Sequence, residues 1–372
     1  MIRENTRKLD YVDALRAWAI LLVILVHTSQ FIAGLPDVAV LLADNGRFGV
    51  QLFFLTSALT MGLSWTDRAG EPEASKAFLI RRLCRIAPMY WLGIAIYFSI
   101  NLGFGLLTGD LSKFNAAYQP LPILLNVLFL HGLWPEGNNT VVPGGWSIGC
   151  EMLFYLLVPL LMRLVTSFRV AVLGAIVTFA GYLGVRWVLA SMGYVTLNFP
   201  IDTFDYYLIA NQMPVFLLGF GLFHVLRGGK TPPAWVGYSV FGLAGIAVVA
   251  LLYRSGWVGP VGPIAVAVAF FGLAVALSHA KSFPKLLLEI GRRSFSIYVL
   301  HFIFAWYIVP RVVKVIPGLT LFPLLCFAVS LGAVIGASYL AAGLTFRWVE
   351  KPGIDFGKKW VKRVQSAAPE TS

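Results

Sequence analysis

Uncharged, apolar runs long enough to cross a lipid bilayer recur along the whole of this 372-residue chain. Charged residues make up 12% of the chain, against about 25% in soluble proteins. A transmembrane β-barrel would instead show short segments of alternating polarity. The sequence therefore predicts an all-α, polytopic membrane protein with about ten transmembrane helices, each of about 20 residues. The predicted spans are 17–34, 48–65, 86–107, 146–164, 170–190, 206–226, 234–253, 258–279, 294–316 and 321–345.

Two apolar segments need separate treatment. The segment 120–134 is short and begins with Pro120 and Pro122, so we expect a re-entrant or outer-surface half-helix rather than a crossing. The first span carries Trp18 and His27 and lacks a small-residue cleavage site, so we expect it to be retained rather than removed as a signal peptide.

The distribution of positive charge predicts the orientation of the chain. With ten spans, the loops on the side of the termini carry 23 of the 29 Lys and Arg residues, and the other side carries 6. Positive charge accumulates in cytoplasmic loops, so both termini are predicted to be cytoplasmic. Counting 120–134 as a span would remove this asymmetry. The same bias accounts for the net charge of +12, so we expect a lipid bilayer and no nucleic acid as partner.

The first span holds two ionisable residues at a helical spacing. Ten uncharged residues separate Arg16 from His27, and eleven steps of about 100° return to nearly the same helix face. The rise is about 16 Å, which places His27 near the bilayer midplane if Arg16 lies at the cytoplasmic interface. An ionisable side chain at this depth is a functional candidate. The alternative is a histidine that donates to a carbonyl of a neighbouring helix.

Three further clusters of polar residues occur within or beside the spans. Arg82 and Arg85 share one helix face, where paired guanidiniums suit a phosphate-rich ligand, although lipid headgroups and topology also explain arginines there. Glu151 is the one acidic residue that we place within a span. A carboxylate there needs a partner or a proton, and its role is either chemical or that of a polar link between helices.

Polar residues extend the last two clusters along their helices. Ser147 and Tyr155 flank Glu151 at i−4 and i+4, so the three form one polar stripe. Tyr298 and His301 share a face of the ninth span with Ser294, for which ordinary packing is an equally good explanation. Three cysteines show no metal-binding spacing, and we expect no metal site.

Five stretches taken together resemble the acyltransferase 3 family of bacterial membrane acyltransferases. They are YVDALRAWAILLVILVH, GRFGVQLFFLTSALTMG, RRLCRIAPMYW, GGWSIGCEMLFYLLVPLL and SFSIYVLH, which follow one another in the expected order between residues 11 and 301. The resemblance implies a family-type transmembrane domain over 1–350, followed by a basic, partly disordered cytoplasmic tail over 351–372. It also implies a location in the bacterial inner membrane.

The resemblance carries roles for individual residues. The family's arginine and histidine separated by ten residues match Arg16 and His27, and its paired arginines match Arg82 and Arg85. These matches imply an acyl-CoA donor held by the arginines and a catalytic His27. The Trp-Ser-x-x-x-Glu element corresponds to Trp146, Ser147 and Glu151, and Ala58 replaces a usual glycine in FFLTSA. We expect this protein to lack the hydrolase-like extracytoplasmic domain that some members carry.

These observations lead to one functional hypothesis. We expect an acyl group, above all acetyl, to pass from cytosolic acyl-CoA to a hydroxyl of an envelope polysaccharide or other glycoside. His27 acts as general base or transient acyl acceptor, and Glu151 orients or stabilises the imidazole. Substrate contacts are expected from Trp146, Ser147, Tyr155, Tyr298 and His301. We expect no permanently bound cofactor.

Two other classes of function stay open from the sequence. A proton-coupled transporter of a sugar or acyl compound would use His27 and Glu151 as a relay, but we find no inverted repeat. A non-enzymatic scaffold would leave both intramembrane ionisable groups unexplained.

Overall fold

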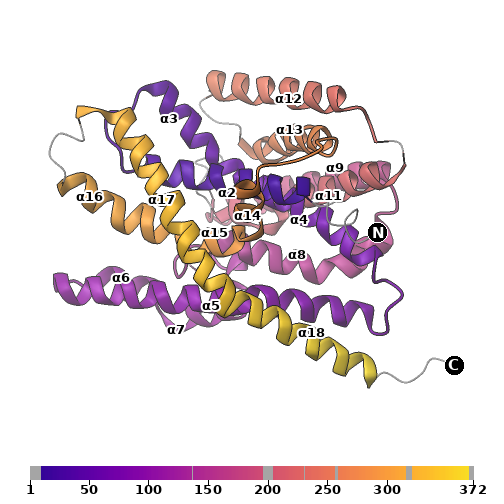
Figure 1. Cartoon of the computed structure of the whole chain (residues 1–372), viewed down its shortest axis with the longest axis horizontal. Helices are drawn as coiled ribbons and strands as arrows, with labels where there is room; N and C mark the ends of the chain where they lie inside the picture. The colour runs from indigo at the N-terminus through magenta and orange to yellow at the C-terminus, as the bar shows by residue number, and fades with distance from the viewer. Residues whose placement is uncertain are drawn as a thin grey trace.

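The fold consists of helices that run roughly side by side (Figure 1). A computed structural model describes residues 10–135, 137–195, 204–229, 231–255, 259–315 and 321–367, and the ordered elements of these ranges are all helical. Within them, ten helical stretches are long and apolar enough to cross a membrane. The predicted all-α class and number of spans are therefore confirmed.

The bounds of the spanning helices follow the predicted apolar runs closely. They are α2 Asp10–Ser29, α4 Gly49–Thr66, α5 Ala74–Thr108, α8 Gly145–Leu164, α9 Phe168–Ser191, α11 Ile209–Arg227, α12 Ala234–Ser255, α13 Gly262–Leu277 and α17 Pro323–Thr345. The ninth span, Ser294–Val315, begins with α15 Ser294–Phe302 and continues through the π-helical turn Ile303–Ile308 and α16. Shorter helices connect or extend them: α3 Asp37–Asp44, α6 Ser112–Ala117, α7 Pro120–Val127, α10 Phe204–Tyr207, α14 Lys285–Arg292 and α16 Val309–Val315.

Two spans begin earlier than predicted because charged residues were excluded from the apolar runs. α2 begins at Asp10 rather than 17, and α5 begins at Ala74 rather than 86. Arg16 lies within α2, where protein rather than lipid surrounds its side chain. Hydropathy therefore underestimates a span wherever a charge faces other helices.

The helices differ in how much of their surface other helices cover. α2 and α11 are largely buried, with Leu15, Ile20 and Phe216 fully enclosed. α9 and α12 lie at the periphery, where Ile176 and Leu243 expose well over half of their side-chain surface. Exposed aliphatic rows of this kind suit contact with lipid tails.

The segment 120–134 does not form a spanning helix, as predicted. It contains α7 and a single 3₁₀ turn, His131–Leu133. Its polar groups bond to the neighbouring spans. Tyr90 of α5 donates to Asn126 Oδ1 at 2.7 Å, and His131 Nε2 lies 2.9 Å from the Gly145 carbonyl of α8. The segment therefore penetrates between α5 and α8, which positions the start of α8.

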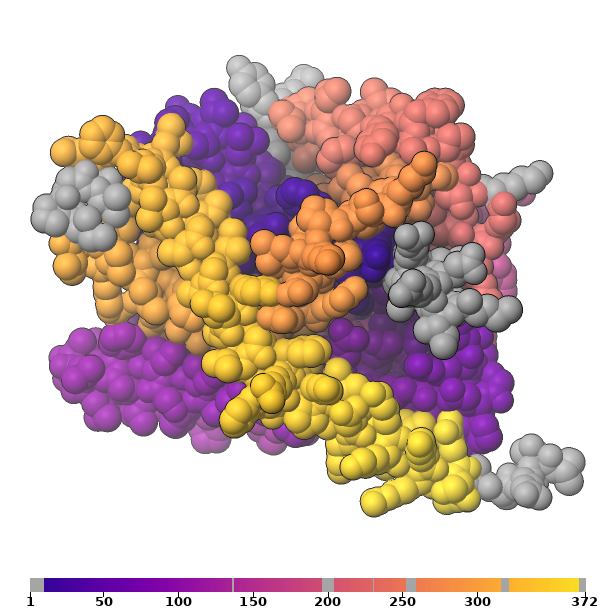
Figure 2. Space-filling view, in the orientation of Figure 1, coloured from indigo at the N-terminus to yellow at the C-terminus, as the bar shows by residue number. Residues whose placement is uncertain are grey.

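The region expected to be a tail is largely a helix. A π-helical turn, Phe346–Glu350, continues α17 into α18, which spans Lys351–Ser366. α17 and α18 cross one face of the molecule diagonally (Figure 2), and α18 lies against α5. Residues 368–372 of the predicted tail lie outside the described residues.

The contact between α18 and α5 depends on a proline and a glycine. Pro88 has no N–H, so it cannot donate to the Cys84 carbonyl in the hydrogen-bond ladder of α5. Gly353 of α18 meets this site: a Cβ at Gly353 would lie 2.5 Å from the Cys84 carbonyl oxygen and 2.8 Å from the Pro88 ring. The absence of a side chain at Gly353 lets the two helices approach.

We expect Gly353→Ala to lower the stability of the protein by about 1–3 kcal/mol, because neither the carbonyl nor the ring can move away easily. Thermal unfolding of the purified protein in detergent measures the effect. Gly332→Ala is the matched control, because no atom lies within 4 Å of a Cβ there. An equal melting temperature for Gly353→Ala and the wild type would contradict the close approach of α18.

Candidate active site

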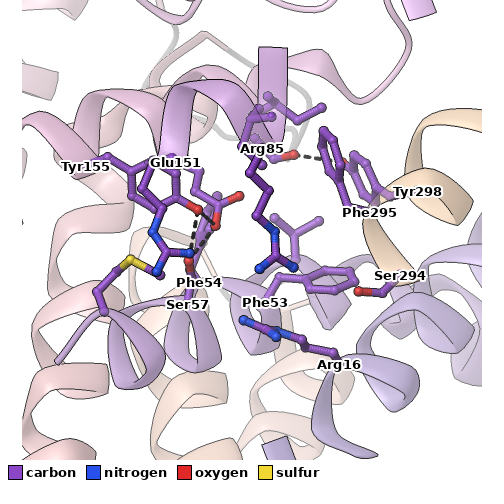
Figure 3. Close-up of a pocket in the computed structure, with 16 residues that line it drawn as sticks. Arg16, Phe53, Phe54, Ser57, Arg85, Glu151, Tyr155, Ser294, Phe295 and Tyr298 are labelled. Atoms are coloured by element: carbon purple, nitrogen blue, oxygen red, sulfur yellow. Dashed lines mark hydrogen bonds between the residues drawn. The ribbon is translucent and has the colours of Figure 1, made fainter. Parts of the chain in front are cut away.

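A pocket lies between five of the spanning helices, and its empty space, including the part open to solvent, is about 640 Å³. α2, α4, α5, α8 and α15 each contribute to its wall, and Figure 3 shows most of the polar side chains that line it. The sixteen lining residues are Arg16, Val50, Phe53, Phe54, Ser57, Met61, Arg82, Arg85, Ile86, Ser147, Ile148, Glu151, Tyr155, Ser294, Phe295 and Tyr298. Segments far apart in the sequence thus form one concave site.

Three guanidiniums line the same pocket. Arg16 donates to Thr60 Oγ1 at 3.1 Å and lies 3.9 Å from Asp13. Arg82 lies over the rings of Phe78 and Tyr155, with its Cζ 5.5 and 5.9 Å from their centroids. In the part of the chain that the structure describes, Arg82 Nε is buried without a hydrogen-bond partner.

The cations of the pocket outnumber its carboxylates. Glu151 is the one acidic residue among the lining side chains, against three arginines. Among the described residues, neither Arg82 nor Arg85 has a carboxylate within 4.0 Å. Uncompensated charge in a partly enclosed site is costly, and an anionic ligand that accepts bidentate hydrogen bonds would relieve that cost. The pocket is therefore suited to phosphate or carboxylate groups.

Glu151 is held by two hydroxyl groups. Tyr155, one turn further along α8, donates to Glu151 Oε1 at 2.5 Å. Ser57 of α4 donates to the same oxygen, as the dashed lines in Figure 3 show. The two bonds fix the carboxylate in the wall of the pocket, and they tie α8 to α4 at this depth.

A second pair of hydroxyls closes the pocket on the side of α15. The hydroxyls of Ser147 and Tyr298 lie 2.8 Å apart, and Tyr298 donates to the Gly144 carbonyl at 3.0 Å. Gly144 has a φ of +73°, and a Cβ there would lie 2.8 Å from the Tyr298 hydroxyl oxygen. The glycine therefore allows both the left-handed turn and the close approach of Tyr298.

His27 does not line this pocket. It lies further along α2, where its ring packs against Phe302, His301 and Trp306 at centroid distances of 4.4, 5.4 and 5.6 Å. Tyr298 stands between the two regions, because it lines the pocket and its ring also packs 5.7 Å from that of His301. Arg16 donates to Thr60 of α4, whereas the ring contacts of His27 go to α15 and the π-helical turn Ile303–Ile308 that follows it.

The structure brings most of the predicted site residues together. Seven of them line the pocket: Arg16, Arg82, Arg85, Ser147, Glu151, Tyr155 and Tyr298. His301 lies beside His27 instead, and Trp146 packs on Phe54 and Tyr207, outside the lining.

The expected support of His27 by Glu151 is not formed. The hydrogen bonds of Glu151 go to Ser57 and Tyr155, and the ring contacts of His27 go to α15 and the π-helical turn that follows it. The expectation was wrong because the sequence gives the depth of each residue but not the rotation of its helix.

Sequence reasoning missed Ser57 as a site residue. It lies in the FFLTSA stretch, directly before Ala58. A serine within an otherwise apolar span was the available signal. The described residues contain no cluster of three metal-ligating side chains.

A comparison with protein families identifies the family of this chain. Residues 9–341 match the family model for the acyltransferase domain of the acyltransferase 3 family. The chain belongs to this family, and with its ten apolar helices it is a multi-pass membrane protein.

Two curated proteins are similar to the chain. Regulator of hypoxia-inducible factor 1 of Caenorhabditis elegans is 28% identical over 187 residues, which cover 45% of this chain and 37% of the nematode protein. Exopolysaccharide production protein ExoZ of Rhizobium meliloti (strain 1021) is 26% identical over 266 residues, which cover 69% of this chain and 75% of that protein. No solved structure matches the chain significantly.

Proposed function

We propose that this protein transfers an acetyl group from cytosolic acetyl-CoA to a hydroxyl of an envelope polysaccharide. The observation that carries the proposal is the convergence of Arg16, Arg82 and Arg85 on one pocket with a single carboxylate. Coenzyme A bears phosphates at one end and a thioester at the end of a long, narrow arm. Guanidiniums bind phosphate through paired hydrogen bonds, so the pocket holds the phosphate end of the donor.

The arm of the donor then extends along α2 towards His27. Arg16 and His27 are eleven positions apart on α2, which corresponds to about 16 Å along the helix axis. Tyr298 and Phe53 line the pocket where the arm would pass, and their rings lie 5.9 Å apart in an edge-to-face contact. In this proposal the tyrosine shifts when the donor binds, because it separates the pocket from His27.

The reaction is a direct acyl transfer. The hydroxyl oxygen of the acceptor attacks the thioester carbonyl carbon, and His27 takes the hydroxyl proton as general base. The new carbon–oxygen bond forms, the carbon–sulfur bond breaks, and the proton passes to the departing CoA thiolate. Alternatively, His27 attacks the thioester first and carries the acyl group to the hydroxyl. Glu151 acts at the donor, where it orients Tyr155 and balances part of the arginine charge.

The class of acceptor is proposed from a relative. ExoZ of Rhizobium meliloti is named for exopolysaccharide production, and 69% of this chain aligns with it. A polysaccharide offers many hydroxyls, and the acetyl ester is the product that an acyltransferase would form on them.

The transfer reaction tests this proposal directly. We expect the purified protein to move label from [¹⁴C]acetyl-CoA to polysaccharide isolated from host cells that lack the gene. Mild alkali should release the label, because it is held as an ester. A folded protein that neither binds acetyl-CoA nor labels the polysaccharide would refute the proposed activity.

The transporter hypothesis gains no support from the arrangement of the two ionisable residues. A proton relay needs a continuous path between His27 and Glu151, whereas the side chain of His27 contacts α15 and that of Glu151 contacts α4. Family membership also points to acyl transfer.

A further inference from the structure

Three buried ring nitrogens without partners cluster around His27. They are His27 Nδ1, His301 Nε2 and Trp306 Nε1, each enclosed and without a hydrogen bond in the described part of the chain. The rings of His27 and His301 lie 5.4 Å apart, and those of His27 and Trp306 lie 5.6 Å apart. Buried polar atoms are almost always paired, so three orphans in one place indicate a site built for a polar ligand.

The protonation of His301 is fixed by its backbone contact. His301 Nδ1 lies 2.7 Å from the Tyr298 carbonyl oxygen, which can only accept a hydrogen bond. Nδ1 therefore carries the proton, and in the neutral ring Nε2 is a hydrogen-bond acceptor. The Trp306 indole offers only a donor. The cluster thus presents one acceptor and one donor next to His27, which is the complement of a hydroxyl group.

The backbone that carries Trp306 is unusual. Residues Ile303–Ile308 form a π-helical turn between α15 and α16. Such turns are rare, and they occur frequently at functional sites because the wider turn re-aims the side chains that it carries. Here the turn brings Trp306 against both His27 and Phe302, whose ring lies 4.7 Å from that of the indole.

We propose that His301 and Trp306 form the subsite for the sugar hydroxyls of the acceptor, beside His27. Trp306 Nε1–H donates to a hydroxyl oxygen, and His301 Nε2 accepts from a hydroxyl proton. The faces of Phe302 and Trp306 offer an apolar platform for the C–H face of a sugar ring. This inference rests on the proposed function and names the residues that recognise its acceptor.

The subsite is separate from the donor pocket. None of His27, His301 and Trp306 lines that pocket, and no arginine is among the ring contacts of the cluster. Binding requires a small adjustment, because the three nitrogens are covered in the structure without ligand. An uncharged sugar fits this region better than a phosphate does, because among the described residues no lysine or arginine is recorded in contact with these rings.

Two substitutions remove the proposed hydrogen bonds while keeping the shape of the side chains. Trp306→Phe removes the indole donor and keeps an aromatic ring. His301→Asn keeps a donor towards the Tyr298 carbonyl and removes the acceptor at Nε2. We expect each variant to raise the KM for the polysaccharide about tenfold, because a buried partner is lost. The Kd for acetyl-CoA should stay unchanged.

The acceptor in this experiment is the polysaccharide isolated from host cells that lack the gene. Trp235→Phe is the control, because that indole is exposed on α12. An unchanged KM for the polysaccharide in folded Trp306→Phe would overturn the proposed subsite. Should His301→Asn fail to fold, the result for Trp306→Phe is sufficient on its own. An equal rise in the Kd for acetyl-CoA would assign the cluster to the donor and would also overturn it. Absence of transfer by the wild type would instead refute the proposed function.

Discussion

Replacing His27 with alanine is expected to abolish acetyl transfer while leaving acetyl-CoA binding intact. His27 lies outside the arginine pocket, so the phosphate end of the donor keeps all of its partners. Loss of a general base lowers turnover by about 10²–10⁴-fold, and loss of an acyl-accepting nucleophile lowers it at least as far. The measurements are label transfer to the polysaccharide and equilibrium binding of acetyl-CoA by the same preparation.

Two controls separate chemistry from folding in this experiment. His279→Ala removes an exposed imidazole just beyond the end of α13 and should leave transfer unchanged. His27→Asn keeps much of the side-chain volume against Phe302 but has no group able to take a proton at neutral pH. If His27→Asn transfers acetyl at the wild-type rate, the histidine is a packing residue and the proposed mechanism fails.

Neutralising Arg82 and Arg85 together is expected to raise the Kd for acetyl-CoA about 100-fold or more. Each guanidinium would lose charge-assisted hydrogen bonds worth about 1.5–3 kcal/mol, and each 1.4 kcal/mol corresponds to about a tenfold change in Kd. The double variant Arg82→Ala/Arg85→Ala should still fold, because neither side chain forms an ion pair in the described residues. Isothermal titration in detergent gives the Kd.

The control for this experiment removes the same charge elsewhere. Lys76 and Arg163 are exposed, lie outside the pocket, and belong to the predicted cytoplasmic side. The variant Lys76→Ala/Arg163→Ala should bind acetyl-CoA as the wild type does. A matching loss of affinity in both double variants would show a general effect of positive charge. Wild-type affinity in Arg82→Ala/Arg85→Ala would assign these arginines to topology alone.

The conservative replacement of both arginines tests the geometry of the contact. Arg82→Lys/Arg85→Lys keeps two positive charges but loses the planar, two-pronged donor. We expect a Kd between those of the wild type and the alanine variant, because only part of the attraction to phosphate depends on charge alone.

The sequence predicted the spans well because the bilayer acts on consecutive residues. Every residue of a crossing helix must satisfy its backbone within the helix and tolerate a dry environment, so each span is a local property of about 20 positions. This is why α4 and α8 match their apolar runs almost to the residue. It also explains why the starts of α2 and α5 were predicted too late. Arg16 and Arg82 belong to these helices but face protein rather than lipid.

The sequence also predicted most of the charged residues that line the pocket, because an ionisable group is rare within an apolar span. Arg16, Arg82, Arg85 and Glu151 interrupt apolar surroundings, and all four line one pocket. Helical spacing then placed Tyr155 with Glu151 correctly, since residues four apart share a face. Such contacts within a single helix are determined by the sequence alone.

Contacts between helices were decided only by the tertiary structure. Ser57 and Glu151 are partners across 94 positions of the chain, and His27 faces His301 rather than Glu151. The sequence by itself determined an all-α membrane protein of about ten spans, the place of its polar groups along each span, and its family. The rotation and neighbours of each helix follow from packing side chains of ten helices at once, and no local pattern encodes that collective fit.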